Sequence, residues 1–342
     1  MPAGSIRLGL RVHPLTKPLL LLDLCDGGIF AVLLRRSGAG IHGGDGMIFS
    51  GARRFCGLVV RVRVVRLGLV VGAVALACGG GAGARPAPSA PAAAHLYWTI
   101  ILGGKVRKAS LDGTGVATIA TGQTYPTGVA VDGTNLYWTN LGASNTIVES
   151  NLDGTNAMTI ATGNTPYGVA VGGGHLYWAD YGNGGNPKDK IVEANLDGTN
   201  AKTIAITPFP VAVAVGGGHL YWADTGTKIV EASLNGANAR TIAKGKKFFP
   251  VGVAVAGGHL YWATSAYGHG AGNDTIVEAN LNGTGAKTIA TEGYGQLRGL
   301  AAGGGHLYWT FADTIVEANL DGTGATTIVT KQNRPGGVAV GP

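Results

Sequence analysis

The residues of this chain best suited to chemistry are histidines and carboxylates, and most of them recur at fixed positions. Five histidines each precede a Leu-Tyr dipeptide, and five glutamates share a position in a later segment of the same repeat. Residues repeated in this way usually have structural roles. The repeated residues are His95, His175, His219, His259 and His306, with Glu149, Glu193, Glu231, Glu278 and Glu317. His269 lies outside this set, five residues before Asp274, and is therefore the candidate for a ligand contact or a catalytic base.

The repeated glutamates could form an acidic ring, but we expect them to face solvent or to pair with bases in the next segment. Bases stand at the matching positions Lys202, Arg240 and Lys287. Carboxylates from different repeats would lie too far apart for paired acid–base catalysis. Residues 95–342 contain no GxSxG, HExxH, P-loop, CxxC or calcium-loop pattern. We therefore predict no catalytic residues, no bound metal and no cofactor.

The basic net charge belongs to the N-terminal part of the chain. The formal charge is +7, but residues 1–94 hold eleven Lys and Arg against three Asp, which leaves −1 for residues 95–342. All three cysteines, Cys25, Cys56 and Cys78, also precede residue 95. Because residues 95–342 are nearly neutral, they offer no extended basic surface, and we predict no nucleic-acid partner. Because they contain no cysteine, they cannot form a disulfide framework.

Residues 47–77 have the organisation of a secretory signal. Arginines precede the apolar run 67–77, and Ala75-Leu76-Ala77 fits a small-residue cleavage site. The sequence through Cys78 resembles a bacterial lipobox, which would make Cys78 a lipidation site; simple secretion and a signal anchor are the alternatives. Residues 78–94 have the Gly/Ala/Pro composition of a linker. Residues 1–46 stay unassigned, either as an extension or as residues upstream of a start at Met47.

Residues 95–342 consist of one unit repeated six times. Leu-Tyr-Trp recurs at separations of 40, 40, 44, 40 and 47 residues and accounts for all six tryptophans. In the unit 168–205 we predict four strands, at 168–171, 175–180, 190–196 and 201–205, with a tight Asp-Gly turn before the last. A period of 40–45 residues with four short strands is typical of a β-propeller blade.

The two ends of the repeated region predict how the ring closes. The region starts at the second strand of a unit and ends with a first strand, 335–341. The C-terminal strand should therefore complete the blade that residues 95–121 begin. We predict an all-β, six-bladed β-propeller of four-stranded blades over residues 95–342, present as a monomer.

The repeats also resemble a known family. LYWAD at 176–180 and 220–224, together with NLDGTN at 195–200, is similar to the YWTD repeat of low-density lipoprotein receptor class B, over all of residues 95–342. This resemblance implies a six-bladed propeller. The final Asp of the motif occurs only as Asp180 and Asp224, and no Cys-rich module flanks the repeats. The resemblance therefore does not extend to the ligands of that receptor family.

Length variation falls on one face of the predicted propeller. The interval from the repeat tryptophan to the third strand ranges from 6 to 14 residues, whereas the interval from there to the next tryptophan stays at 31 to 33. The loops between the second and third strands of each blade vary in length. They lie on the same face of the propeller as the loops that connect one blade to the next, and a face with variable loops usually binds partners. Candidate binding residues there are Tyr125, Tyr167, Tyr181, Phe209, Phe249, His269, Tyr294 and Phe311. The alternative is that each ring packs on the neighbouring blade.

The favoured function is a non-enzymatic, extracytoplasmic propeller, secreted or lipid-anchored, that binds a protein or glycan through this face. One alternative is a propeller enzyme of the lyase or hydrolase type. Streptogramin lyases have loosely similar repeats, but they are seven-bladed, and the first strands here offer almost no polar ligands beyond Asp132. A purely structural envelope protein is the other alternative.

Overall fold

The computed structural model describes residues 8–11, 19–24, 28–33, 94–182, 189–225, 228–245, 249–266 and 272–342. The chain divides into two units, residues 1–82 and 83–342. In the first unit, β1 (Leu8–Arg11), β2 (Leu19–Leu24) and β3 (Gly28–Leu33) form an antiparallel sheet in that order. The predicted leader 47–77, Cys78 and His269 lie outside the described residues. Within the described part, no helix long and apolar enough to span a membrane is found.

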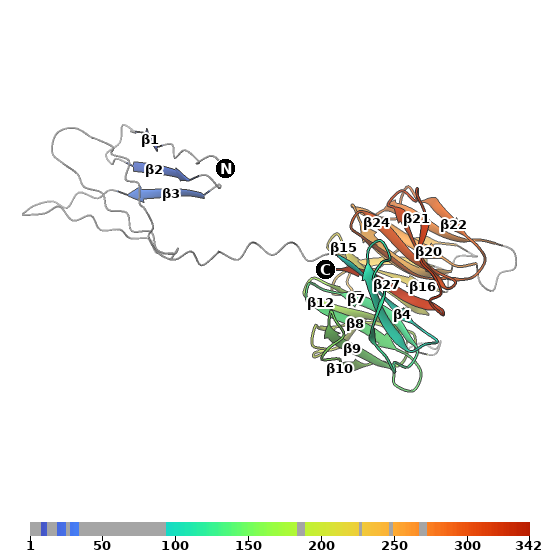
Figure 1. Cartoon of the computed structure of the whole chain (residues 1–342). Helices are drawn as coiled ribbons and strands as arrows, with labels where there is room; N and C mark the ends of the chain where they lie inside the picture. Colours follow the sequence, from blue (N-terminus) through green and yellow to red (C-terminus); the bar gives the residue numbers. More distant parts are fainter. Residues whose placement is uncertain are drawn as a thin grey trace, which may run out of the picture. The chain divides into compact units, whose positions relative to one another are not determined.

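The second unit contains six four-stranded antiparallel blades, as predicted (Figure 1). Blade 1 holds β27 (Pro335–Gly341), β4 (His95–Ile100), β5 (Lys105–Ser110) and β6 (Ala117–Ala120). Blade 2 holds β7 (Pro126–Val131), β8 (Asn135–Asn140), β9 (Thr146–Asn151) and β10 (Met158–Thr162). Blade 3 holds β11 (Pro166–Gly172), β12 (His175–Asp180), β13 (Lys190–Asn195) and β14 (Lys202–Ile206).

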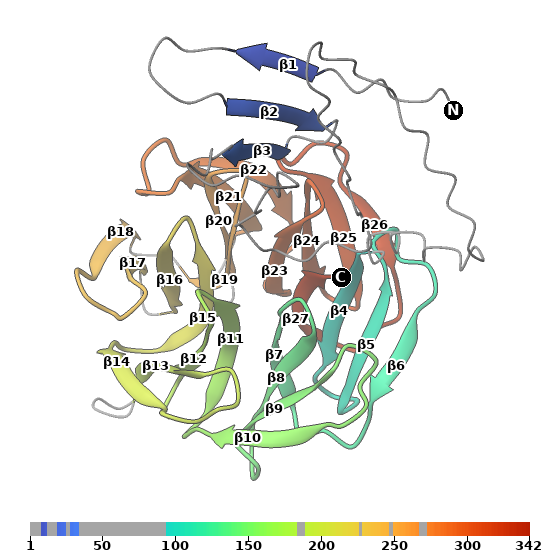
Figure 2. The same cartoon turned by 90° about the vertical axis from the view of Figure 1, so that its left-hand side faces the viewer.

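The other three blades continue the ring in chain order. Blade 4 holds β15 (Pro210–Gly216), β16 (His219–Asp224), β17 (Lys228–Ser233) and β18 (Arg240–Lys244). Blade 5 holds β19 (Pro250–Ala256), β20 (His259–Thr264), β21 (Asp274–Asn280) and β22 (Lys287–Glu292). Blade 6 holds β23 (Leu297–Gly303), β24 (His306–Phe311), β25 (Thr314–Asn319) and β26 (Thr326–Val329). The first strands surround the centre and the fourth strands lie at the perimeter (Figure 2).

The ring closes through the C-terminal strand, which confirms the prediction. β27 pairs antiparallel with β4, with Val338 opposite Trp98 and Gly341 opposite His95. The first and last strands of the propeller therefore belong to the same sheet. Because β27 pairs with β4, the inner edge of β4 is covered by another strand.

The repeated Leu-Tyr-Trp segment forms the core between blades. In β12, Leu176, Tyr177 and Trp178 are all at least 98 % buried. Trp178 packs with Ala130 and Tyr137 of blade 2, so the second strand is covered by neighbouring blades on both faces. A strand buried on both faces carries a nearly continuous apolar run instead of an alternating one, and this explains the character of the repeat.

The repeated polar residues have the structural roles expected of them. Three of the five glutamates pair with the base opposite them on the fourth strand: Glu193 with Lys202 at 3.2 Å, Glu231 with Arg240 at 2.5 Å and Glu278 with Lys287 at 2.8 Å. Glu149 instead accepts from Asn135 Nδ2 at 2.6 Å, and Glu317 accepts from the Tyr308 hydroxyl at 3.1 Å. The imidazole Nδ1 atoms of His175, His219, His259 and His306 lie 3.1 to 3.3 Å from the glutamate of the same blade. The His–Glu pairs therefore join the second and third strands in blades 3 to 6, and the bases extend this to the fourth strand in blades 3 to 5.

Candidate functional site

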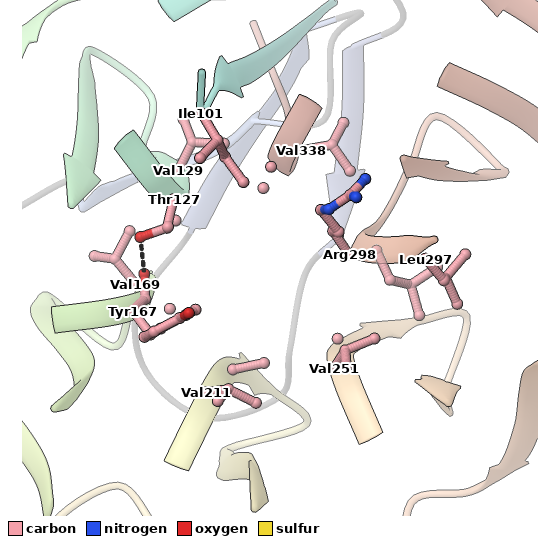
Figure 3. Close-up of a pocket in the computed structure, with 18 of the residues that line it drawn as sticks. Ile101, Thr127, Val129, Tyr167, Val169, Val211, Val251, Leu297, Arg298 and Val338 are labelled. Atoms are coloured by element: carbon pink, nitrogen blue, oxygen red, sulfur yellow. Dashed lines mark hydrogen bonds between the residues drawn. The ribbon is translucent and has the colours of Figure 1, made fainter. Parts of the chain in front are cut away.

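The first halves of the six inner strands surround a cavity of about 940 Å³ at the centre of the ring (Figure 3). Each inner strand contributes its second residue to the wall. These residues, which we call the channel ring, are Thr127, Tyr167, Val211, Val251, Arg298 and Gly336. In Figure 3 the five labelled members, Thr127, Tyr167, Val211, Val251 and Arg298, follow one another around the opening in chain order, so that Arg298 lies across the cavity from Tyr167.

The next residue of each inner strand is small because neighbouring inner strands approach closely there. A Cβ atom on Gly168 would lie 2.7 Å from the Cα of Ala212, and one on Gly299 would lie 2.6 Å from the carbonyl oxygen of Gly336. The following position is Val or Leu in every blade and is buried between blades. The channel ring is therefore a variable position inside a repeated frame.

Threonine hydroxyls hold the channel ring in place from the second strands. Thr99 Oγ1 donates to the Thr127 carbonyl at 2.7 Å, and Thr310 Oγ1 donates to the Gly336 carbonyl at 2.7 Å. Thr139 Oγ1 likewise donates to the Tyr167 carbonyl. Each of these bonds joins one blade to the next, so the backbone of the ring is fixed where it carries its variable side chains.

Two arginines give one side of the cavity a positive charge. Arg298 is half-buried, and its Nη1 donates to the carbonyls of Gln296 and Ala312 at 3.2 and 3.3 Å. Burial lowers the pKa of Arg298, with a further contribution from the neighbouring charge of Arg334. Arg334 also lines the cavity, and none of the described residues that line it is Asp or Glu. The charges of Asp313 and Asp274 also act on Arg298 from outside this lining. An anionic group at this mouth would find two guanidinium groups in the described wall.

Aromatic rings occupy the other side. The centroids of Tyr167 and Tyr181 lie 5.7 Å apart, and those of Tyr181 and Phe209 also lie 5.7 Å apart, with the planes tilted. Burial raises the pKa of Tyr167. Tyr125 lines the cavity and is 53 % exposed. Tyr125, Tyr167 and Tyr181 line the cavity, and Phe209 packs on Tyr181; these four side chains form an aromatic arc from blade 2 to blade 4.

The remaining predicted residues lie elsewhere. Phe311 packs against the core of blades 5 and 6. Tyr294 is 46 % exposed and Phe249 is half-buried, and neither lines the cavity. Tyr167, predicted in a loop, is the second residue of β11.

Five cavity residues were not predicted from the sequence: Thr127, Val211, Val251, Arg298 and Arg334. The ring residues could have been found from one sequence feature. Each follows the Pro or Leu that opens an inner strand, and this position varies between repeats while the positions on either side of it are nearly constant.

Aspartates, most of them buried, hold the variable loops to the ends of the inner strands through hydrogen bonds. Asp180 Oδ1 accepts from the backbone N–H groups of Asn164 and Thr165 at 2.8 and 2.7 Å. Asp189 accepts from Phe209 N at 3.1 Å, and Asp313 accepts from Arg334 N at 2.8 Å. The most extensive set of these bonds belongs to Asp274, which accepts from Ala266, Gly295, Gln296 and Leu297 at 2.7 to 2.9 Å. These bonds give the face around the cavity its shape.

One aspartate of this face makes stability depend on pH. Burial raises the pKa of Asp224 from 3.8 to about 6, although the Thr207 hydroxyl and Lys228 act to lower it. The carboxyl group has a higher pKa in the folded chain than in the unfolded chain. As the pH rises from the unfolded pKa to the folded pKa, the unfolded chain loses this proton while the folded chain keeps it, so the free energy of unfolding decreases. Between about pH 4 and pH 6 this decrease amounts to about 3 kcal/mol.

Replacing Asp224 by Asn should remove that titration, because Asn keeps an acceptor for Thr207 but has no ionised form. We expect urea unfolding at pH 4.5, 6 and 7.5 to show a smaller loss of stability with rising pH in Asp224→Asn than in the parent chain. Parallel pH profiles for the two proteins would contradict the assignment.

The described residues contain no group of three or more His, Cys, Asp or Glu side chains that could hold a metal ion. No family model matches the sequence, and a search of curated proteins found no match. Among solved structures, the chain is similar to a chain in the crystal structure of a nidogen/laminin complex, with a TM-score of 0.62 and 22 % sequence identity. The similarity covers 72 % of this chain and 98 % of the other. At this identity it shows a shared propeller fold.

Proposed function

We propose that residues 95–342 form a non-enzymatic binding propeller, which takes a protein partner at the mouth of the central cavity. The observation that carries the proposal is the channel ring, since five different residue types stand at one position of a frame that otherwise repeats. Repetition supplies the rigid scaffold, and variation at one position supplies specificity. A glycan that presents comparable chemistry is the alternative ligand.

The chemistry of the mouth supports a partner with an apolar segment beside an acidic group. The arc of Tyr125, Tyr167, Tyr181 and Phe209 offers the kind of side chains that dominate interface energies. Arg298 on the opposite side provides a half-buried guanidinium group for a carboxylate. The similar fold in the nidogen/laminin complex is also consistent with a propeller that binds protein.

The N-terminal sequence supports an extracytoplasmic location for this propeller. Arginines followed by the apolar run 67–77 would direct secretion, and Cys78 would carry a lipid anchor if the lipobox is used. We further propose that the mature protein is a monomer. Mass spectrometry of the mature N-terminus tests the anchor, because an unmodified Cys78 would exclude it.

The binding site is tested by capture of the partner with matched variants. We expect Tyr167→Ala and Arg298→Ala each to weaken capture from envelope extract at least about 30-fold, as buried aromatic and arginine anchors do. Met158→Ala is the control, because Met158 is 59 % exposed on β10 and does not line the cavity. Thermal unfolding of each variant verifies the fold. Capture that is unchanged in both cavity variants would exclude this site.

A further inference from the structure

Four of the six tryptophans of the repeat share a hydrogen-bonding arrangement. The indole Nε1–H points to the loop before the inner strand and finds a side-chain oxygen there. The bonds run from Trp98 to Gln332 (2.9 Å), from Trp138 to Gln123 (2.8 Å), from Trp222 to Thr207 (3.3 Å) and from Trp309 to Glu292 (2.8 Å). Loop side chains therefore satisfy these buried donors.

Trp178 of blade 3 departs from this arrangement. Its side chain is 2 % exposed, and its Nε1–H has no acceptor among the described residues. Gln123 and Gln332 stand three residues before the proline that opens the inner strand, and Gly163 occupies that position before Pro166. Glycine has no side chain to supply the oxygen. A buried donor without a partner is energetically costly, so an external acceptor at this point would be favoured.

A pocket lies beside Gly163 and Trp178. It has a volume of about 320 Å³ and shares no lining residue with the central cavity. That volume is about ten times the ~30 Å³ that one water molecule occupies in the liquid. Its wall includes Gly163, Trp178, Lys190, Lys202 and Thr203. The pocket therefore has room for a small molecule or for the end of a side chain.

The polar groups of the pocket wall that could still bind a ligand are mainly hydrogen-bond donors. Asp180, which also lines the pocket, already accepts two backbone N–H groups, and the Nζ of Lys190 lies 3.9 Å from it. In blade 4 the equivalent Lys228 lies closer to its aspartate, at 3.4 Å, and the Thr207 hydroxyl donates to that same aspartate. Lys190 is thus the less tightly held of two lysines at one repeated position.

From this donor set we propose that the pocket between Gly163 and Lys190 binds a carboxylate, held by the Trp178 Nε1–H and the Lys190 ammonium group. Both donors suit an anionic oxygen, and charge assistance strengthens such bonds. The carboxylate can belong to a sugar acid or to an acidic amino acid. The site is separate from the central cavity, so it does not depend on the function proposed for the channel ring.

Indole N–H signals of the ¹⁵N-labelled full chain test the proposal directly. The chain has six tryptophans, so Trp178→Phe identifies the Trp178 signal by removing one of six resonances. We expect glucuronate or N-acetylglutamate to shift this signal saturably. Glucose and N-acetylglutamine are the neutral controls, and comparison of the two acids distinguishes the source of the carboxylate. No response to either acid, or an equal response to the neutral compounds, would overturn the proposal.

Three variants separate binding from a general effect on the fold. Lys190→Met should weaken the response at least tenfold, whereas Lys228→Met, at the same position of the next blade, should leave it unchanged. Gly163→Gln should provide an internal acceptor, as Gln123 does for Trp138, and remove the response to the ligand. The other five indole signals report whether each variant is folded. An equal response in Lys190→Met and the parent chain would overturn the proposed role of Lys190.

Discussion

Replacing Asp274 by Ala is expected to destabilise the propeller by about 4 kcal/mol, because several backbone donors lose their acceptor together. The Asp274 side chain is fully buried and accepts from Ala266, Gly295, Gln296 and Leu297. Alanine leaves these N–H groups facing a gap, and the loops can only partly rearrange to reach water. In a thermal melt the change corresponds to a decrease of about 10 °C in Tm for a domain of this size.

The same variant should also weaken partner binding at the central cavity. Leu297 and Arg298 are consecutive, so loss of the bond to Leu297 N releases the start of β23 and with it the guanidinium group of Arg298. Asp313→Ala is the matched control, since Asp313 is exposed and accepts from Arg334 N; we expect it to cost at most about 1 kcal/mol. Similar melting temperatures for the two variants would contradict the central role of Asp274.

The propeller itself could be predicted from the sequence because its determinants repeat. Each Leu-Tyr-Trp segment fills the same space between two blades, and each Asp-Gly or Asn-Gly turn needs the positive φ that glycine provides, as at Gly113. Six copies of the signal also fix the number of blades. Even the closure followed from strand order, because the repeat begins at a second strand and ends at a first one.

The candidate site was harder to predict because it lies where the repeat is broken. Tyr125, Tyr167 and Tyr181 were recognised as aromatic loop residues, but Arg298 and Val211 sit inside strands that read as ordinary apolar segments. Only the structure shows that the second residue of each inner strand faces one shared cavity.

The aspartates that hold the loops were missed for a related reason. Asp180 ends a second strand whereas Asp274 begins a third strand, so equivalent roles occupy different positions of the repeat. When residues with the same role stand at different positions of the repeat, a single sequence shows no periodic pattern for them.

Removing residues 335–342 should abolish cooperative unfolding, because this segment is the inner strand of blade 1. Without β27, β4 loses its partner on the channel side. Val338 no longer fills the space beside Trp98, and Ala339 no longer fills the space beside Tyr97 and Trp138. Blades 2 and 6 also lose the strand between them, with which Gly128 and Gly299 are in close contact. The expected loss exceeds about 5 kcal/mol, which is comparable to the whole stability of many domains.

Removal of Pro342 alone is the control for this truncation. It deletes the carbonyl that accepts the Tyr97 hydroxyl at 2.9 Å and should cost about 1 kcal/mol. A synthetic peptide of residues 335–342, added to the truncated chain at millimolar concentration, should restore part of the cooperative transition, because it supplies the same pairing without the covalent link. If the truncated chain melted cooperatively within a few degrees of the parent, β27 would not be the element that locks the ring, and the rigidity of the channel ring would have to come from contacts between the other blades.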